Sequence, residues 1–198
     1  MSEVGNQLFP VFLQLNHLRT LLVGGGKVAL EKLTALLGNS PQAAVTVVAR
    51  EASPAVRDFI RGYPSVTLHE RAFEDTDLDG VDVVVVAADN TGLNTHIRAE
   101  SRKRHLLVNV ADKPDLCDFY LGSVVKKGNL KIGISTNGKS PTIAKRIKEV
   151  LNDALPEEID ETLTYMSRLR DLLKGDFTDK VRTLNAHTVS LLASKEKK

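Results

Sequence analysis

Three consecutive glycines, Gly24 to Gly26, stand between an apolar run and a segment with helical periodicity. The run 20–23 (TLLV) ends at the first glycine, as a buried parallel strand would. Residues 24–29 match the pattern G-x-G-x-x-A. In this pattern the first glycine permits a tight turn, the second lets the backbone approach a pyrophosphate, and the final small residue allows close helix packing. The pattern predicts a dinucleotide site at a helix N-terminus, against the alternative of a packing turn without a ligand.

The alternation of apolar strand and amphipathic helix continues to about residue 110. We predict further strands at 44–49, 66–68, 81–88 and 106–110. The predicted helices are 28–37 with a stop at Gly38 and Asn39, a helix from Ser53 and Pro54 to Gly62, and 91–104. Strands and helices that alternate at this pitch predict an α/β fold with a doubly wound parallel sheet.

The pattern changes after Asp112. Residues 119–125 and 130–135 read as an antiparallel hairpin around 127–129, and a helix follows Ser140 and Pro141 to about residue 151. The chain is predicted to be helical beyond Pro156, where the apolar stripes are explained by core packing. A hairpin with one helix cannot bury a core of its own, so we expect a second subunit to cover it.

Composition excludes several classes of function. A net charge of +2 gives no basic excess for a nucleic-acid partner. The single cysteine excludes a disulfide within the chain and a thiolate metal cage. The five histidines show no ligand-pair spacing, so no metal site is predicted. No apolar stretch reaches the roughly 18 residues needed to span a bilayer, and no signal peptide is recognised, so we expect a cytoplasmic protein.

The residues that follow the second predicted strand leave the choice of cofactor open. The acidic residue usual at that place is missing, and Ala49 is followed by Arg50 and Glu51. Arg50 could accept the 2′-phosphate of NADP, whereas Glu51 could still reach the ribose hydroxyl of NAD. After the fourth strand, Ala88 and Asp89 either line the adenosine side of the cofactor or, for Asp89, cap the next helix.

Several short motifs occur together in one order along residues 8–150. They are Leu8 to Phe12, Val23 to Lys32, Ala87 to Asn90 with Leu93 and Asn94, Asn109 to Asp112, Asp118 with Phe119, and Ser135 to Pro141. As a set, these motifs resemble the precorrin-2 dehydrogenase family, which includes the N-terminal half of bacterial sirohaem synthase. The resemblance implies NAD-dependent oxidation of precorrin-2 to sirohydrochlorin. Some members also insert Fe²⁺, and whether this chain does so stays open.

The resemblance also implies a domain organisation and a set of cofactor contacts. We expect an NAD-binding Rossmann domain over 1–112, a dimerisation region over 113–143 whose hairpin exchanges between the subunits of a homodimer, and a C-terminal helical domain over 144–198. The family's methyltransferase domain is missing, so this chain is not expected to make precorrin-2 itself. The family favours NAD despite Arg50. By position, Lys27, Val28, Arg50 and Glu51 match the family's cofactor contacts. The cofactor contacts predicted from the glycine pattern and the strand ends are Gly24, Gly25, Gly26, Ala88, Asp89 and Asn109.

Asp112 is the predicted catalytic residue. It follows a predicted strand, and the ends of parallel strands face the crevice in which ligands bind. The resemblance assigns it a catalytic role, and a carboxylate beside the tetrapyrrole could accept the proton that oxidation releases. The alternative is a turn-forming Asp before Lys113 and Pro114. Asn109 either orients the nicotinamide amide or satisfies local backbone groups.

A tetrapyrrole with many carboxylates requires cationic and N–H groups around it. Ser140 matches a family serine near this site, and it is also expected as a helix N-cap. Cys117 is interpreted as a structural thiol. The predicted substrate-binding residues are Lys113, Lys139, Ser140, Lys145 and Arg146. The competing hypothesis is a non-enzymatic module that senses NAD or carries a tetrapyrrole.

Overall fold

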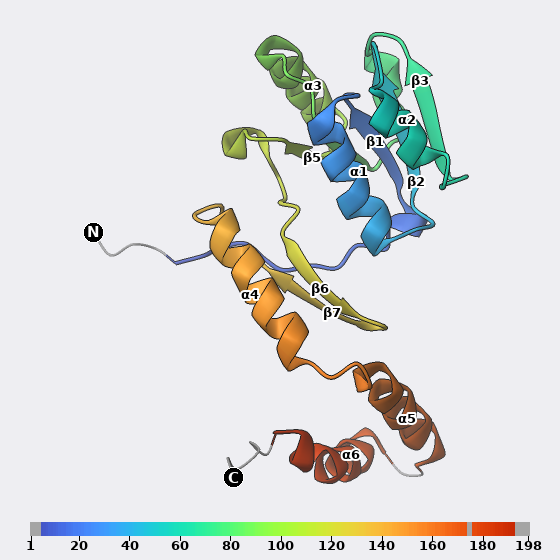
Figure 1. Ribbon diagram of the computed structural model, residues 1–198, viewed down its shortest axis with the longest axis vertical. Helices are drawn as coiled ribbons and strands as arrows, with labels where there is room; N and C mark the ends of the chain where they lie inside the picture. The colour runs from blue at the N-terminus through green and yellow to red at the C-terminus, as the bar shows by residue number, and fades with distance from the viewer. Residues whose placement is uncertain (1–4, 174–175, 193–198) are drawn as a thin grey trace. The chain divides into compact units, whose positions relative to one another are not determined.

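The computed structural model of the chain describes residues 5–173 and 176–192 (Figure 1). The described residues form two compact units, one of residues 7–121 and the other of the described residues from Gly122 onward together with Gly5 and Asn6. The first unit ends later than the predicted boundary after Asp112. The reason is that Asp118 and Phe119 remain hydrogen-bonded to the last strand of its sheet.

The first unit is a parallel five-stranded sheet with the strand order β3-β2-β1-β4-β5. Its strands are β1 (Arg19–Val23), β2 (Ala44–Ala49), β3 (Val66–Glu70), β4 (Val83–Val86) and β5 (Leu107–Val110). Its helices are α1 (Lys27–Asn39), α2 (Pro54–Ile60) and α3 (Thr91–Lys103), with short 3-10 helices η1 (Leu15–His17), η2 (Asp75–Leu78) and η3 (Pro114–Leu116). This arrangement confirms the predicted doubly wound α/β fold.

The two faces of the sheet bury separate apolar cores, because successive side chains of a strand point to opposite faces. On one face, Leu22 packs with Leu33 of α1 and Val56 of α2. On the other face, Leu21 packs with Ile97 of α3. The two cores hold the helices on both sides of the sheet.

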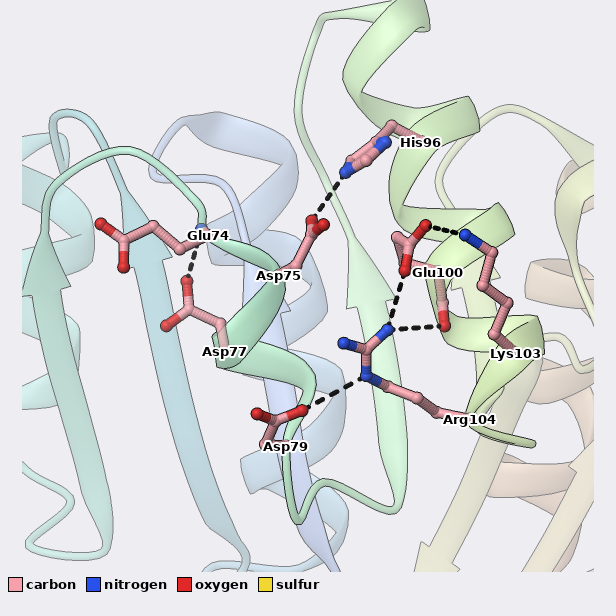
Figure 2. A network of polar contacts seen from close by, with 8 residues as sticks. All are labelled: Glu74, Asp75, Asp77, Asp79, His96, Glu100, Lys103 and Arg104. Carbon is pink, nitrogen blue, oxygen red and sulfur yellow. Dashed lines mark hydrogen bonds and ion pairs between the residues drawn. The ribbon is translucent and has the colours of Figure 1, made fainter.

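A network of polar side chains joins η2 to α3 (Figure 2). His96 of α3 contacts Asp75 at 2.6 Å, and Arg104 bonds to Glu100 at 2.9 Å and to Asp79 at 3.3 Å. These groups lie mostly at the surface, where each ion pair contributes little to stability. Together they link η2 to α3, the helix that follows β4 in the chain.

The structure defines three element ends more closely than the sequence did. Helix α1 ends at Asn39, within the predicted stop of Gly38 and Asn39, and Gly38 itself does not adopt the positive φ of a helix-ending glycine. The N-cap of α3 is Asn90, whose Oδ1 accepts a hydrogen bond from Leu93 N at 2.9 Å, and not Asp89. The predicted strand 81–88 is shorter, since only its central valines pair with β1.

The second unit contains the hairpin and the last helices. Its elements are β6 (Ser123–Lys127), β7 (Leu130–Ile134), α4 (Pro141–Ala154), α5 (Ile159–Leu172) and α6 (Phe177–Leu192). The strands pair antiparallel as predicted, through a two-residue turn that begins with Gly128 at φ +55°, as a type II′ turn requires. The first strand starts later than predicted, because Phe119 and Leu121 pack against the core of the first unit.

Acidic side chains at the start of α5 hold the hairpin. The Asp160 Oδ1 atom accepts hydrogen bonds from Asn129 N at 2.6 Å and from Asn129 Nδ2 at 2.8 Å. Glu157 forms an ion pair with the ammonium of Lys127, whose side chain is almost fully buried. These contacts fasten α5 to the turn of the hairpin.

Helix α4 leaves an apolar ridge uncovered. Ile143, Ile147 and Val150 follow helical spacing and are 52%, 40% and 65% exposed, whereas Ala144 is the buried residue of the helix. We call these three residues the α4 ridge. No helix among the described residues is long and apolar enough to cross a membrane.

Candidate functional site

The strand register brings the ends of four strands to one edge of the sheet. Val23 pairs with Val48 and with Val86, and Val86 pairs with Val110. The order of the strands reverses between β1 and β4, which is the place where open α/β sheets form a ligand crevice. Asn109 lies within β5, whereas Asp112 and the other predicted cofactor residues follow these strands within three residues or begin the next helix.

Gly24 and Gly25 are required by close backbone contacts. Gly24 has φ +133°, and a Cβ there would lie 2.4 Å from the carbonyl oxygen of Ala87. A Cβ at Gly25 would lie 2.2 Å from the carbonyl oxygen of Glu51 and 2.8 Å from Ala52 Cα. The turn role predicted for Gly24 agrees with this geometry. The crowding at Gly25 depends on the chain after β2, so the glycine pattern alone could not indicate it.

Gly26 is different, because a Cβ at this position would meet nothing within 4 Å. It is the N-cap of α1, and no side chain among the described residues caps this helix. The free N–H groups of the first turn therefore face an open space beside Gly26, as pyrophosphate binding requires. Lys27 is exposed, Val28 is half-buried and Ala29 is fully buried against the sheet, so the small residue has the packing role predicted for it.

The backbone after β4 is held by a buried amide. Asn94 of α3 donates from Nδ2 to the carbonyl oxygen of Ala88 at 3.1 Å. Asp89 is exposed and does not cap the helix, so of the two roles considered for it only the cofactor contact stays a prediction. Asn94 occurs in the motifs that carry the family resemblance, but no role was predicted for it.

Asp112 lies in a strained turn directly after β5. Its φ of +57° is uncommon for a residue with a side chain, and Asp is among the residues that tolerate it best. The turn extends the sheet by one bond from Ala111 N to Val86 O at 2.8 Å, and the side chain of Asp112 is exposed. The turn-forming interpretation is therefore correct, and it is compatible with a role in proton transfer.

Polar groups after the turn fasten its far side to β5. The Cys117 thiol accepts a hydrogen bond from Val110 N at 3.2 Å and lies within hydrogen-bond distance of the Val110 and Lys113 carbonyl oxygens. Burial raises the pKa of this thiol, which agrees with the structural role predicted for Cys117. Asn109 donates from Nδ2 to the carbonyl oxygen of Phe119 at 2.9 Å, which is the local backbone role considered for it.

Asp118 also holds the segment that follows the Asp112 turn to β5. Its carboxylate accepts hydrogen bonds from both guanidinium nitrogens Nη1 and Nη2 of Arg98, the second at 2.7 Å, and from Val108 N at 3.1 Å. The guanidinium is the main cause that lowers the pKa of Asp118. Sequence reasoning missed Arg98, because nothing in the local pattern connects α3 with the segment after β5.

The predicted substrate-binding residues are divided between the two units. Lys113 belongs to the first unit, beside Asp112. In the second unit the Ser140 hydroxyl accepts a hydrogen bond from Ile143 N at 3.2 Å, which confirms the predicted N-cap of α4. Arg146 forms an ion pair with Glu149 at 2.9 Å. The other two predicted residues of this unit, Lys139 and Lys145, are exposed near the same helix start.

No cluster of three or more His, Cys, Asp or Glu side chains that could hold a metal ion occurs within residues 5–173 and 176–192.

Comparisons with known proteins show which family the chain belongs to. Residues 11–123 match the family described as "Putative NAD(P)-binding", and residues 127–154 match the one described as "Sirohaem biosynthesis protein central". The chain is 33% identical over 171 residues to the siroheme synthase of Pseudoalteromonas atlantica, a match that covers 86% of this chain and 36% of the relative. The siroheme synthase of Methylococcus capsulatus is 32% identical over 166 residues, with 83% and 34% covered.

The chain thus spans about a third of the length of these curated relatives. A solved structure described as "SirC, precorrin-2 dehydrogenase" matches over more of its own length. It has a TM-score of 0.73 and 26% identity, over 92% of this chain and 89% of that one.

Proposed function

Because the chain belongs to the family of NAD(P)-binding sirohaem-biosynthesis proteins, we propose that it oxidises precorrin-2 to sirohydrochlorin with NAD. One observation carries the proposal. An open helix N-terminus at Gly26 and the carboxylate of Asp112 follow two strands of one sheet and lie at the same edge of it. A dinucleotide and a proton acceptor would meet there.

Different residues of the chain would bind the cofactor and accept the proton. The N–H groups at the start of α1 would bind the pyrophosphate, and the open space at Gly26 would admit it. Bound NAD supplies the hydride acceptor. The oxidation removes a hydride and one proton from the substrate, and the carboxylate of Asp112 would take the proton. Asp118 and Cys117 would keep Asp112 in place by holding the segment that follows it.

We propose that cationic side chains bind the substrate carboxylates, because a tetrapyrrole with many carboxylates needs them. Lys113 lies next to Asp112 in the sequence, whereas Lys139, Lys145 and Arg146 lie near the start of α4. Ser140 would contribute a hydroxyl in addition to its role as N-cap. The exposed α4 ridge supports a homodimer, because a second subunit would bury its apolar surface.

The proposal is tested by incubating the purified chain with precorrin-2 and NAD. We expect NADH absorbance and sirohydrochlorin absorbance to rise together at equal molar rates. Intact NAD binding without any turnover would favour the competing hypothesis of an NAD-sensing or tetrapyrrole-carrying module. Turnover of an Asp112→Ala variant at the wild-type rate would remove this residue from the mechanism.

Insertion of Fe²⁺ into sirohydrochlorin is a second activity that the same site would support. The observation that favours it is again Asp112, since insertion requires a base that takes the pyrrole protons. The iron would enter as a substrate of this reaction. Adding Fe²⁺ or Co²⁺ to sirohydrochlorin with and without the protein measures this activity, and equal rates would exclude it.

A further inference from the structure

Glu70, the last residue of β3, holds Arg57 of α2 in a two-pronged ion pair. Arg57 Nη2 lies 2.6 Å from Glu70 Oε1, and Arg57 Nε lies 3.3 Å from Glu70 Oε2. The same Oε1 atom accepts a hydrogen bond from Ala52 N at 3.0 Å. One carboxylate therefore fixes both a cationic side chain and the backbone that follows β2.

This pair lies next to the glycine loop. Glu70 is paired with Ala49 at the end of β2. The backbone of Glu51 and Ala52 fills the space in which a Cβ of Gly25 would stand, and Ser53 N donates to the Gly25 carbonyl oxygen at 2.8 Å. The segment 51–53 thus touches the glycine loop, and Glu70 is hydrogen-bonded to this segment. In such folds the residues after the second strand contact the adenosine ribose.

The charges around the segment that follows β2 are balanced. Two cations, Arg50 and Arg57, stand with two carboxylates, Glu51 and Glu70. Glu70 is the main cause that raises the pKa of Arg57, and the charge of Glu51 adds to it. A 2′-phosphate is a strong anion that needs unengaged guanidinium donors, whereas a 2′-hydroxyl needs an acceptor and no net positive charge.

We propose that Glu70 sets the preference of this protein for NAD over NADP by keeping Arg57 engaged and the local charge neutral. Without the carboxylate charge, the same residues sum to +1, and the Arg57 guanidinium becomes available to a 2′-phosphate. The proposal rests on the dinucleotide binding that underlies the proposed function and is independent of the oxidation.

The test compares the dissociation constants of NAD and NADP, measured by calorimetry without tetrapyrrole, for the wild type and Glu70→Gln. The Gln side chain retains an oxygen for Ala52 N, so the variant should keep the fold, which thermal melting checks. We expect NADP to bind about tenfold more tightly in Glu70→Gln, the effect of one gained charge-assisted hydrogen bond, with NAD changed less than about threefold.

Asp58→Asn is the matched control, because it removes one negative charge from α2, the helix of Arg57, at a residue that is paired with Arg61. This control variant should leave the ratio of the NADP and NAD dissociation constants unchanged. The double variant Glu70→Gln with Arg57→Gln should bind NADP no more tightly than the wild type does.

Two outcomes would overturn the proposal. One is a ratio of NADP and NAD dissociation constants in Glu70→Gln that equals the wild-type ratio. The other is a strong loss of NADP affinity in Arg57→Gln alone, since Arg57 would then already contact the phosphate. Failure of all variants and the wild type to bind NAD would instead contradict the proposed function.

Discussion

Arg98 of α3 and Asp118 form an ion pair that covers the edge of the sheet beside β5. Asp118 forms two hydrogen bonds with Val108 of the edge strand. Its carboxylate accepts a hydrogen bond from Val108 N at 3.1 Å, and its own N–H donates to Val108 O at 2.7 Å. Arg98 holds the same carboxylate through two nitrogens. The pair therefore anchors the segment that follows Asp112 to the edge strand at Val108.

Removing the charge of Asp118 should destabilise the protein. In Asp118→Asn the hydrogen bond to Val108 N can persist, but the pairing with Arg98 is lost. We expect the free energy of unfolding to fall by about 1–2 kcal/mol, because the groups are partly exposed. Urea denaturation measures this change. Asp115→Asn, an exposed carboxylate in the same segment, is the control, and an equal loss in both variants would contradict the assigned role.

The stability contributed by Asp118 should depend on pH. Arg98 lowers the pKa of this carboxyl in the folded state, so the unfolded state binds the proton more tightly. The contribution is fully present above the unfolded pKa of about 3.9 and is lost as the pH falls through the lower folded value. The difference in unfolding free energy between wild type and Asp118→Asn should thus be constant from pH 7 to 5 and shrink below about pH 4. If this difference in unfolding free energy instead grew below pH 4, the folded-state pKa of Asp118 would be raised and not lowered.

Gly25 and Gly26 should respond differently to alanine. In Gly25→Ala the new Cβ would overlap the backbone of Glu51, so we expect a loss of more than about 3 kcal/mol or failure to fold. In Gly26→Ala the Cβ enters open space at φ −94°, so the fold should persist while NAD affinity falls. Thermal melting and NAD titration separate the two effects. Full NAD affinity in a folded Gly26→Ala would place the pyrophosphate elsewhere.

Cys117 should be slow to react with thiol reagents. Burial raises the pKa of its thiol and so lowers the fraction of reactive thiolate. We expect an aromatic disulfide reagent at pH 8 to modify Cys117 at least about tenfold more slowly in the native protein than in urea. Release of the chromophore measures both rates on the same single thiol. Equal rates would mean that the sulfur contacts with β5 open freely in solution.

Features set by a few neighbouring residues could be predicted, and those set by distant contacts could not. The glycine loop, the Ser53 and Ser140 caps and the strand β2 follow from local sequence, and the structure confirms them. The crowding at Gly25 and the bonds of Glu70 and Asp118 join segments far apart in the chain, so no local pattern indicates them.

Some element ends could be predicted only to within a residue or two. Helix α1 ends at Asn39, within the predicted stop of Gly38 and Asn39, but Gly38 itself lies inside the helix. Asp89 and Asn90 are equivalent as helix caps by residue type, and the backbone decides that Asn90 bonds to Leu93.

Three substitutions of Asp112 can separate proton transfer from turn formation. Asn and Gly both tolerate a φ of +57°, so Asp112→Asn and Asp112→Gly should fold with wild-type stability, whereas Asp112→Ala should lose about 1 kcal/mol. If the carboxylate takes the proton, all three should lose at least about 100-fold in the rate of precorrin-2 oxidation, the usual contribution of a general base, and retain NAD binding. Melting temperature, NAD titration and NADH formation test this together. Activity that follows stability, with Asn and Gly active and Ala impaired, would leave Asp112 as a turn residue alone.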